Sequence, residues 1–183
     1  MMSDEVKPFS KVAVLYGGSS SEREISLITG KAVFDSLQLK GVNAILIDTI
    51  EPFIEALKTE RVTHAWIALH GSDGEDGKIQ SILNMLNIKY TGSDPITCSI
   101  TMNKYFTKSI LKSNGFKTPE FMVVDSSTQY ENIIKELKEP FVLKQCSEGS
   151  SIGIFIVENR EEYLDHFSEL EKSNDWIIAE QFM

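Results

Sequence analysis

The residues best suited to chemistry lie in a glycine-rich segment, His70 to Gly77 (HGSDGEDG). The apolar run Ala65 to Leu69 precedes it and predicts a buried strand, because no polar residue interrupts the run. After the segment, apolar residues recur at helical spacing: Ile79, Ile82, Leu83 and Leu86. A strand, a glycine-rich loop and a helix in this order form a geometry in which a helix N-terminus binds an anion.

The charges of this loop narrow the choice of anion. Asp73, Glu75 and Asp76 would repel a free phosphate at close range. A carboxylate held by His70, in a substrate that also carries an ammonium group, fits the loop better. The alternative is that Glu75 and Asp76 only cap the helix that follows.

A second unit of the same kind stands at the beginning of the chain. Lys11 to Tyr16 predicts a strand that ends at a glycine pair, without the spacing of the dinucleotide fingerprint. Ser21 with Glu24 forms a capping-box pattern for the next helix. Glu22 lies near the start of that helix, where it either serves a site or stabilises the helix dipole.

The intervening elements predict how these two loops are placed. Asn43 to Asp48 and Ile88 to Thr91 predict strands, and Phe53 to Leu57 predicts a short helix. Alternating strands and helices indicate a parallel sheet with right-handed crossovers. The loops at the carboxyl ends of such strands share one edge, which is where ligands bind. Glu22 and His70 are therefore expected on the same rim.

A second region is predicted from residue 95 onward. The expected helices and strands are Ile96 to Met102, Lys104 to Ser113, Glu120 to Val124, Thr128 to Leu137, Phe141 to Lys144, Ile154 to Val157 and Trp176 to Ala179. Lys144 ends one strand and is followed by Gly149, Ser150 and Ser151 before the next strand begins. An ammonium group with loop amides and hydroxyls suits phosphate binding. The alternative is a hairpin with a polar tip.

Composition limits the partners. The 183 residues carry a formal net charge of −9, which argues against a nucleic acid or an anionic membrane as partner. Cys98 and Cys146 have no metal-type spacing; a single disulfide between them stays open, but we interpret both as reduced thiols. The N-terminus lacks the apolar core of a signal peptide, and no apolar run approaches transmembrane length. We therefore expect a soluble cytoplasmic protein.

Four segments together resemble the D-alanine–D-alanine ligases of the ATP-grasp superfamily: SSEREIS from Ser20, HGSDGEDGKIQS from His70, YTGS from Tyr90 and EGSSIG from Glu148. The resemblance covers essentially the whole chain. It implies an α/β fold in which a Rossmann-like parallel-sheet domain, residues 1–94, binds substrate. An α+β first subdomain of the ATP grasp, residues 95–183, follows and is cut off at the adenine hinge.

The resemblance also implies roles for individual residues. Glu22 would receive the ammonium group of the first D-alanine, His70 would lie near that substrate's carboxylate, and Ser150 would join Glu22 in a catalytic network. Lys104 and Lys144 would hold the phosphates of ATP, and Ser151 would belong to a lid over them. The adenine hinge would consist of Glu180, Gln181 and Met183.

The family reaction proceeds in two steps. The γ-phosphoryl group of ATP passes to one D-alanine, and the amine of the second D-alanine attacks the resulting acyl phosphate. Mg²⁺ and lysine charge would neutralise the transferring phosphoryl group. The resemblance implies peptidoglycan synthesis as the purpose and a homodimer as the assembly. The alternatives are a D-alanine–D-lactate-type or other ATP-grasp carboxylate–amine ligase, or a non-catalytic nucleotide- or amino-acid-binding module.

The sequence departs from the family pattern at a few positions. Asn103 stands where aspartate is usual, Gln145 where proline is usual, and Ser72 and Asp73 replace a pair that is often basic or aromatic. Family members also continue into a second half of the clamp, which carries the magnesium carboxylates. We therefore interpret the chain as an N-terminal portion and expect it to be inactive alone. The acidic residues Asp165, Glu169, Glu171 and Asp175 lie on or just after the helix expected beyond Val157, and we expect them to form its solvated face.

Overall fold

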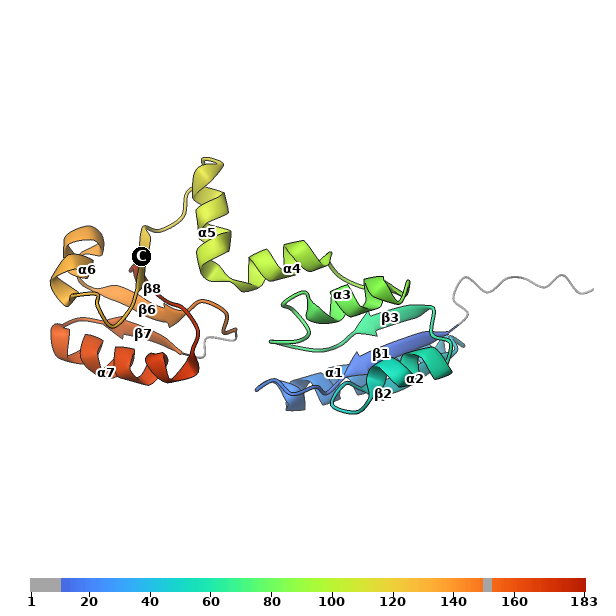
Figure 1. Ribbon diagram of the computed structural model, residues 1–183. Coiled ribbons are helices and arrows are strands. Elements are labelled where there is room, and N and C mark those ends of the chain that lie inside the picture. Colours follow the sequence, from blue (N-terminus) through green and yellow to red (C-terminus); the bar gives the residue numbers. More distant parts are fainter. Residues whose placement is uncertain (1–10, 150–152) are drawn as a thin grey trace, which may run out of the picture. The chain divides into compact units, whose positions relative to one another are not determined.

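The computed structural model describes residues 11–149 and 153–183. It divides into two compact units, one up to Ser99 and one from Ile100 onward, and each unit contains one four-stranded sheet (Figure 1). The first sheet is parallel and the second is antiparallel. The α/β class, with a parallel-sheet domain followed by an α+β subdomain, is confirmed.

The first unit alternates strands and helices. Its elements are β1 (Val12–Tyr16), α1 (Arg23–Leu39), β2 (Ala44–Asp48), α2 (Phe53–Thr59), β3 (His64–Ile67), α3 (Lys78–Met85) and β4 (Lys89–Tyr90), and α4 (Pro95–Met102) spans the division between the units. The strand order is β2-β1-β3-β4, so β1 and β3 are neighbours. The loops that follow β1 and β3 therefore leave the sheet side by side, as the sequence predicts.

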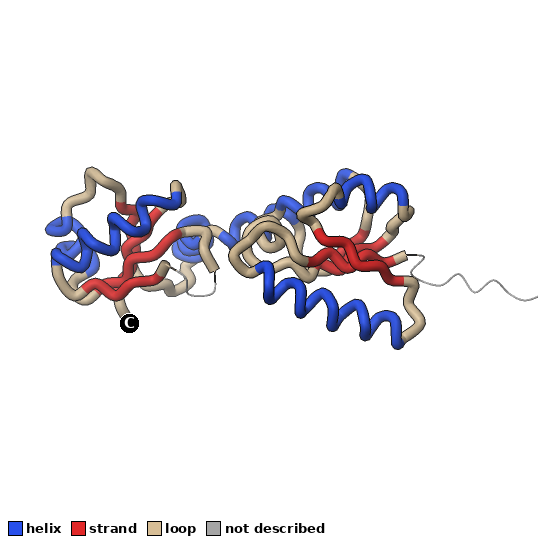
Figure 2. The backbone as a smooth tube through the Cα atoms, turned by 90° about the horizontal axis from the view of Figure 1, so that it is seen from below, coloured by secondary structure: helices blue, strands red, loops and turns tan. Residues whose placement is uncertain are grey.

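The two faces of this sheet are covered unequally. Apolar residues of α2 and α3, including Leu57, Ile79 and Leu83, pack with inward residues of the strands into one core. Figure 2 shows the longest helix, α1, along the opposite face. On that face, Trp66 of β3 is 39% exposed and lines an apolar groove of about 380 Å³. The prediction of a buried strand from Ala65 to Leu69 therefore fails at Trp66, because α1 packs on β1 and β2 and leaves part of β3 open.

The capping box predicted for α1 is also absent. The helix begins at Arg23, and Glu22 in the N-cap position makes no side-chain capping hydrogen bond. The hydroxyl of Ser20 accepts the backbone N–H of Glu22 instead, at 3.2 Å. The start of the helix is therefore fixed from the preceding loop, and the Glu22 carboxylate is not used as a cap.

The second unit has a four-stranded antiparallel sheet in the order β5-β8-β6-β7. Its elements are α5 (Lys104–Ser113), β5 (Phe121–Val124), α6 (Tyr130–Leu137), β6 (Phe141–Gln145), β7 (Ile154–Val157), α7 (Arg160–Leu170), the 3₁₀ turn η1 (Glu171–Ser173) and β8 (Ile177–Gln181). β8 is two residues longer at its end than the sequence predicts, because Glu180 and Gln181 pair with Phe121 and Phe141. Both cysteines are free and buried, as expected for reduced thiols.

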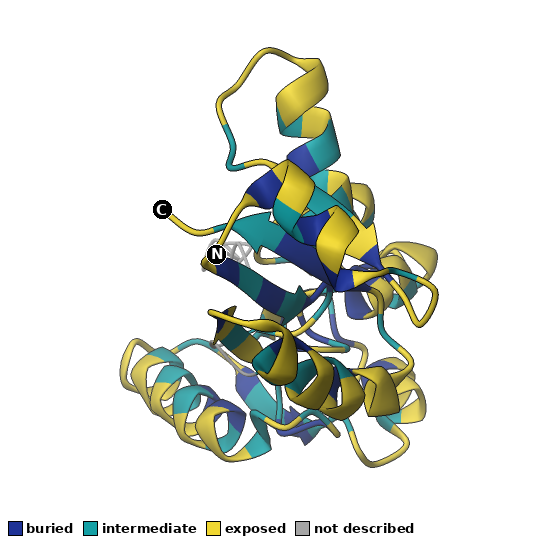
Figure 3. Ribbon diagram, turned by 90° about the vertical axis from the view of Figure 1, so that its left-hand side faces the viewer, coloured by how far each residue is buried: buried dark blue, intermediate teal, exposed yellow. Residues whose placement is uncertain are grey.

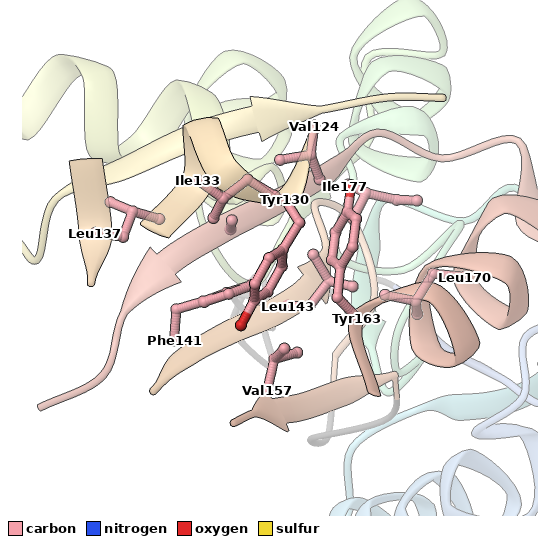
Figure 4. Close-up of a cluster of buried hydrophobic side chains, with 11 residues drawn as sticks. Val124, Tyr130, Ile133, Leu137, Phe141, Leu143, Val157, Tyr163, Leu170 and Ile177 are labelled. Atoms are coloured by element: carbon pink, nitrogen blue, oxygen red, sulfur yellow. The ribbon is translucent and has the colours of Figure 1, made fainter. Parts of the chain in front are cut away.

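One face of this sheet is covered by helices α6 and α7. Figure 4 shows Tyr130, Ile133 and Leu137 of α6 gathered with Tyr163 and Leu170 of α7 over the strands. The strand residues of this core are Val124, Phe141, Leu143, Val157, Ile177 and Ala179. Figure 3 shows how buried residues concentrate in the strands, while the helices expose their outward sides.

The opposite face of the second sheet is called the open face here. Strand residues alternate between faces, so it carries Phe121 and Val123 of β5, Trp176, Ile178 and Glu180 on and just before β8, Val142 and Lys144 of β6, and Ile154 and Ile156 of β7. Ile154 is 41% exposed and Ile156 is 50% exposed. Within the described residues this face is therefore only partly covered, and it carries two of the predicted site residues, Lys144 and Glu180.

Candidate functional site

The rim of the first sheet brings Glu22 close to the loop that follows His70. The hydroxyl of Ser20 donates a hydrogen bond of 2.7 Å to the carbonyl of His70. A side chain at Gly71, where φ is +68°, would lie 2.9 Å from Oε2 of Glu22. Only glycine therefore allows this approach without strain. The structure places the two predicted rim residues together, as the parallel topology requires.

The His70 ring is held by helix α1. Its Nε2 lies 3.1 Å from the hydroxyl of Thr29, two turns along the helix from Glu22. The ring is half-buried, so it presents part of its surface to solvent. A carboxylate near this ring and an ammonium group near Glu22 form a pattern that suits a small amino acid.

Ser26 connects the ends of β1 and β3 through buried hydrogen bonds. Its hydroxyl accepts the N–H of Gly17 at 2.9 Å and donates to the carbonyl of Ala68 at 2.7 Å. The residue is fully buried. Ser26 thereby fixes the distance between the loop after β1 and the loop after β3. Sequence reasoning assigned it no role.

We expect Ser26→Ala to lower the free energy of unfolding by about 1–3 kcal/mol, because two buried backbone groups lose their partner. Urea unfolding monitored by circular dichroism measures this. Ser36→Ala is the matched control, since the Ser36 hydroxyl only donates to its own helix at an exposed position. Equal losses in the two variants would contradict the bridging role.

The acidic loop is less negative than its sequence suggests. Lys78 forms ion pairs with Asp73 at 2.9 Å and with Asp76 at 3.0 Å. The hydrogen bond from Lys78 holds the pKa of Asp73 below its usual range. Asp76 also accepts the backbone N–H of Lys78, the first residue of α3. The capping alternative therefore applies to Asp76, although the N-cap position itself is Gly77.

Arg23 and Asp48 brace the loop after β1. The guanidinium group donates to both carboxylate oxygens of Asp48, at 3.0 and 2.6 Å, and to the carbonyl of Gly18 at 2.9 Å. The N–H of Gly18 donates to Asp48 as well. The hydrogen bond from Arg23 is the main reason that the pKa of Asp48 falls to about 2. This pair fixes the residues on both sides of Glu22.

We expect a pH dependence of stability from Asp48. Its pKa is about 2 when folded and about 3.9 when unfolded, so its contribution is complete above pH ~5 and is lost as the pH falls toward 2. Asp48→Asn should therefore cost on the order of 1–2 kcal/mol near neutral pH and much less near pH 2. Urea unfolding across this range measures the difference. A constant difference between parent and variant would contradict the assignment.

The open face brings together three charged residues. Glu180 accepts from Lys144 through Oε1 at 2.9 Å and from Lys108 through Oε2 at 2.7 Å. All three side chains are at least 85% buried. Burial alone would raise the pKa of Glu180, but the hydrogen bonds from Lys108 and Lys144 outweigh burial and lower it. The carboxylate therefore stays charged between two ammonium groups.

Lys104 lies close to this cluster. As the first residue of α5, it donates its N–H to the carbonyl of Cys146 at 2.9 Å, and its ammonium group donates to the carbonyls of Cys146 and Glu148. Burial and the charge of Lys144 lower the pKa of Lys104. Lys104 therefore contacts the loop that follows β6, and it lies near enough to Lys144 for the two predicted phosphate-binding charges to interact.

The other residues predicted to bind ATP lie in different surroundings. The N–H of Gln181 donates to the carbonyl of Glu120 at 2.9 Å, and Gln181 is the last residue of β8. Met183 lies beyond β8 and is 88% exposed. Ser150 and Ser151 lie outside the described residues.

An aromatic group borders the charged cluster. Tyr105 contacts Phe106, Phe121 and Trp176 in edge-on arrangements, with ring centroids 5.5–6.0 Å apart. Phe106 and Trp176 remain about half exposed. Partly exposed rings beside buried charge suit a planar ligand.

The structure explains two departures from the family pattern, Asn103 and Gln145, and corrects one prediction, the solvated position of Asp175. Asn103 caps α5, since its side chain accepts the N–H of Phe106 at 3.1 Å. Gln145 is buried and donates to the carbonyl of Leu170 at 3.3 Å and to Ser173. Asp175 was wrongly assigned to a solvated helix face: its carboxylate accepts the N–H of Ser147 at 2.6 Å and holds the start of the loop after β6.

Lys108 is the residue of this site that sequence reasoning missed. It follows Lys104 by four residues on α5, so the two lysines share a helix face. That spacing was the available signal.

Within the described ranges, no group of three or more His, Cys, Asp or Glu side chains is arranged to hold a metal ion. No helix among those residues is long and apolar enough to cross a membrane.

Comparison with known proteins gives consistent matches. A family model described as "D-ala D-ala ligase N-terminus" matches residues 48–93, and one described as "ATP-grasp domain" matches residues 109–183. A D-alanine--D-alanine ligase of Nitrosospira multiformis is 41% identical over 175 residues, which cover 96% of this chain and 57% of the relative.

Solved structures agree with this. The crystal structure of a D-alanine--D-alanine ligase from Bacillus anthracis matches with a TM-score of 0.86 and 30% identity, covering 94% of this chain and 57% of that one. A structure of the Bacillus anthracis enzyme complexed with ATP matches with a TM-score of 0.83 and 28% identity, covering 94% of this chain and 58% of that one. The chain thus spans about half the length of the curated relatives that it matches.

Proposed function

We propose that this chain, which matches the N-terminal portion of the D-alanine–D-alanine ligases over nearly all of its length, serves the ATP-dependent joining of two D-alanines. The product would be D-alanyl-D-alanine for peptidoglycan synthesis. The observation that supports this most is the arrangement on the open face, where Lys144 is paired with Glu180 and Lys104 lies close enough for its charge to interact with that of Lys144.

The rim of the first unit would bind the first D-alanine. Glu22 would receive the ammonium group, and His70 would lie near the carboxylate. The bracing of the Glu22 loop by Arg23 and Asp48 supports this, because a loop held in one conformation loses less entropy on binding a small ligand than a mobile loop does. Ser150 is proposed to join Glu22 in this site on the strength of the motif alone.

The open face of the second unit would bind ATP. Lys104 and Lys144 would contact the phosphates, with Ser151 in the lid over them. Glu180, Gln181 and Met183 would line the adenine site. The half-exposed Phe106 and Trp176 contact Tyr105, which also contacts Phe121 beside Lys108. A low-polarity border of this kind strengthens charge–charge attraction.

Mg²⁺ would be needed for phosphoryl transfer in such an enzyme. The described side chains do not fit a magnesium site, since the open-face cluster is rich in lysine and has one carboxylate. We propose that the metal ligands belong to the region that the relatives have beyond the matched half.

We also propose a cytoplasmic homodimer that binds neither nucleic acid nor membrane, in keeping with the net charge of −9.

The test uses the protein continued past Met183 through its own reading frame. If that frame ends there, the chain is joined to the C-terminal region of the Nitrosospira multiformis relative. Either is called the extended protein below. Phosphate release from ATP and D-alanine with Mg²⁺ is expected, together with D-alanyl-D-alanine. Turnover only with D-lactate or another second substrate would redirect the proposal, and an absence of turnover in a folded protein would overturn it.

A further inference from the structure

Lys108 is a lysine held in the interior by several partners. Its Nζ donates to Glu180 at 2.7 Å and to the hydroxyl of Thr118 at 2.6 Å. The same ammonium group lies 5.0 Å from the centroid of the Phe121 ring, within cation–π range. The residue is 8% exposed. Its charge is thus satisfied from three directions, which fixes the side chain in one position.

Lys144 occupies a different position on the same carboxylate. Among the described residues its partner is Glu180, at 2.9 Å, and it lies next to Gln145, the last residue of β6 before the loop that follows this strand. One carboxylate therefore stands between two ammonium groups with unequal numbers of partners. Moving away from Glu180 would break fewer interactions for Lys144 than for Lys108.

We propose that Lys108 is a positioning residue that keeps Glu180 in place when Lys144 turns from Glu180 to the phosphates of ATP. The inference rests on the proposed function. Without Lys108, the departure of Lys144 would leave a buried carboxylate unpaired, which is strongly unfavourable. With Lys108 in place, Glu180 keeps a counter-ion and remains a charged acceptor for the 6-amino group of adenine.

A purely structural role for Lys108 makes a different prediction. It would tie α5 to the sheet through Thr118 and Glu180, and its loss would weaken all nucleotides equally through lower stability. The positioning role instead affects the choice of nucleotide, because GTP presents a carbonyl oxygen where ATP presents an amino group. A fixed carboxylate accepts from the amino group and repels the carbonyl.

The experiment measures KM and kcat of the extended protein for ATP and for GTP. For Lys108→Met we expect the KM for ATP to rise roughly tenfold or more and the preference for ATP over GTP to fall by a similar factor, with kcat at saturating ATP changed less. Lys108→Arg keeps the charge and should retain most of the preference. Lys112→Met is the matched control, one turn along α5 in an exposed ion pair with Glu120.

A second measurement uses the 183-residue chain without nucleotide. Carbon-13 NMR titration of the Glu180 carboxyl should show a higher pKa in Lys108→Met than in the parent, because burial is then opposed by Lys144 alone. An unchanged pKa, or an unchanged preference for ATP in an active extended protein, would overturn the inference. If the parent extended protein is inactive, the proposed function itself fails.

Discussion

The 183-residue chain, assayed by itself with ATP, D-alanine and Mg²⁺, is expected to release phosphate at least about a thousandfold more slowly than the extended protein. Phosphoryl transfer depends on metal ions and preorganised charge, because the protein has little covalent work to do. The described part of the chain offers lysines at the proposed phosphate site and no group of three or more His, Cys, Asp or Glu side chains that is arranged to hold a metal ion.

The exposed surface of the second unit adds to this expectation. Ile154, Ile156 and Val123 present apolar surface on the open face, which α6 and α7 do not cover. An adenine on this face would be screened from water on one side only, so the affinity for nucleotide should be low.

The assay is a coupled measurement of phosphate release, with the 183-residue chain and the extended protein at equal concentration. Circular dichroism confirms that the shorter chain is folded, so that a lack of turnover is not attributed to unfolding. Turnover by the shorter chain within about tenfold of the extended protein would contradict the expectation and would place the metal site within these 183 residues.

The rim of the first unit was largely predictable from the sequence. Hydrophobic periodicity and glycine-rich loops predicted a parallel sheet, and the loops after β1 and β3 meet because these strands are neighbours. The uneven cover of that sheet was not predictable. An uninterrupted apolar run such as Ala65 to Leu69 does not say which helix lies over it, and Trp66 is left partly exposed.

The second unit shows a different limit. Lys108 was missed because it lies on an amphipathic helix, where a lysine is usually solvated, and Asp175 was wrongly assigned because it stands in a polar stretch that is typical of a solvated turn. Their roles depend on tertiary neighbours: Glu180 lies across from Lys108, and Ser147 lies beside Asp175. The four-residue spacing of Lys104 and Lys108 indicates a shared helix face, but the local pattern of charge does not identify a partner that lies 72 or 28 residues away.

Lys144→Met in the extended protein is the second change for which we expect a large effect. It removes an ammonium group from the proposed phosphate site and leaves a side chain of similar length. We expect catalytic efficiency with ATP to fall roughly a hundredfold or more, because a charged contact to the transferring phosphate is lost.

Stability should change little by comparison. Glu180 keeps the ion pair with Lys108 at 2.7 Å after the substitution, so no buried carboxylate is left without a counter-ion. The methionine side chain can pack along the path of the lysine stem beside the apolar residues of the open face. Unfolding in urea should therefore show a loss of about 1 kcal/mol or less.

Lys135→Met is the matched control, since Lys135 is an exposed lysine on α6, the helix that covers the other face of the same sheet. Steady-state kinetics at matched ionic strength compare the two variants with the parent. If Lys144→Met and Lys135→Met retain equal efficiency, Lys144 does not bind phosphate. If Lys144→Met unfolds instead, Lys108 does not suffice to hold Glu180, and the division of roles between the two lysines is wrong.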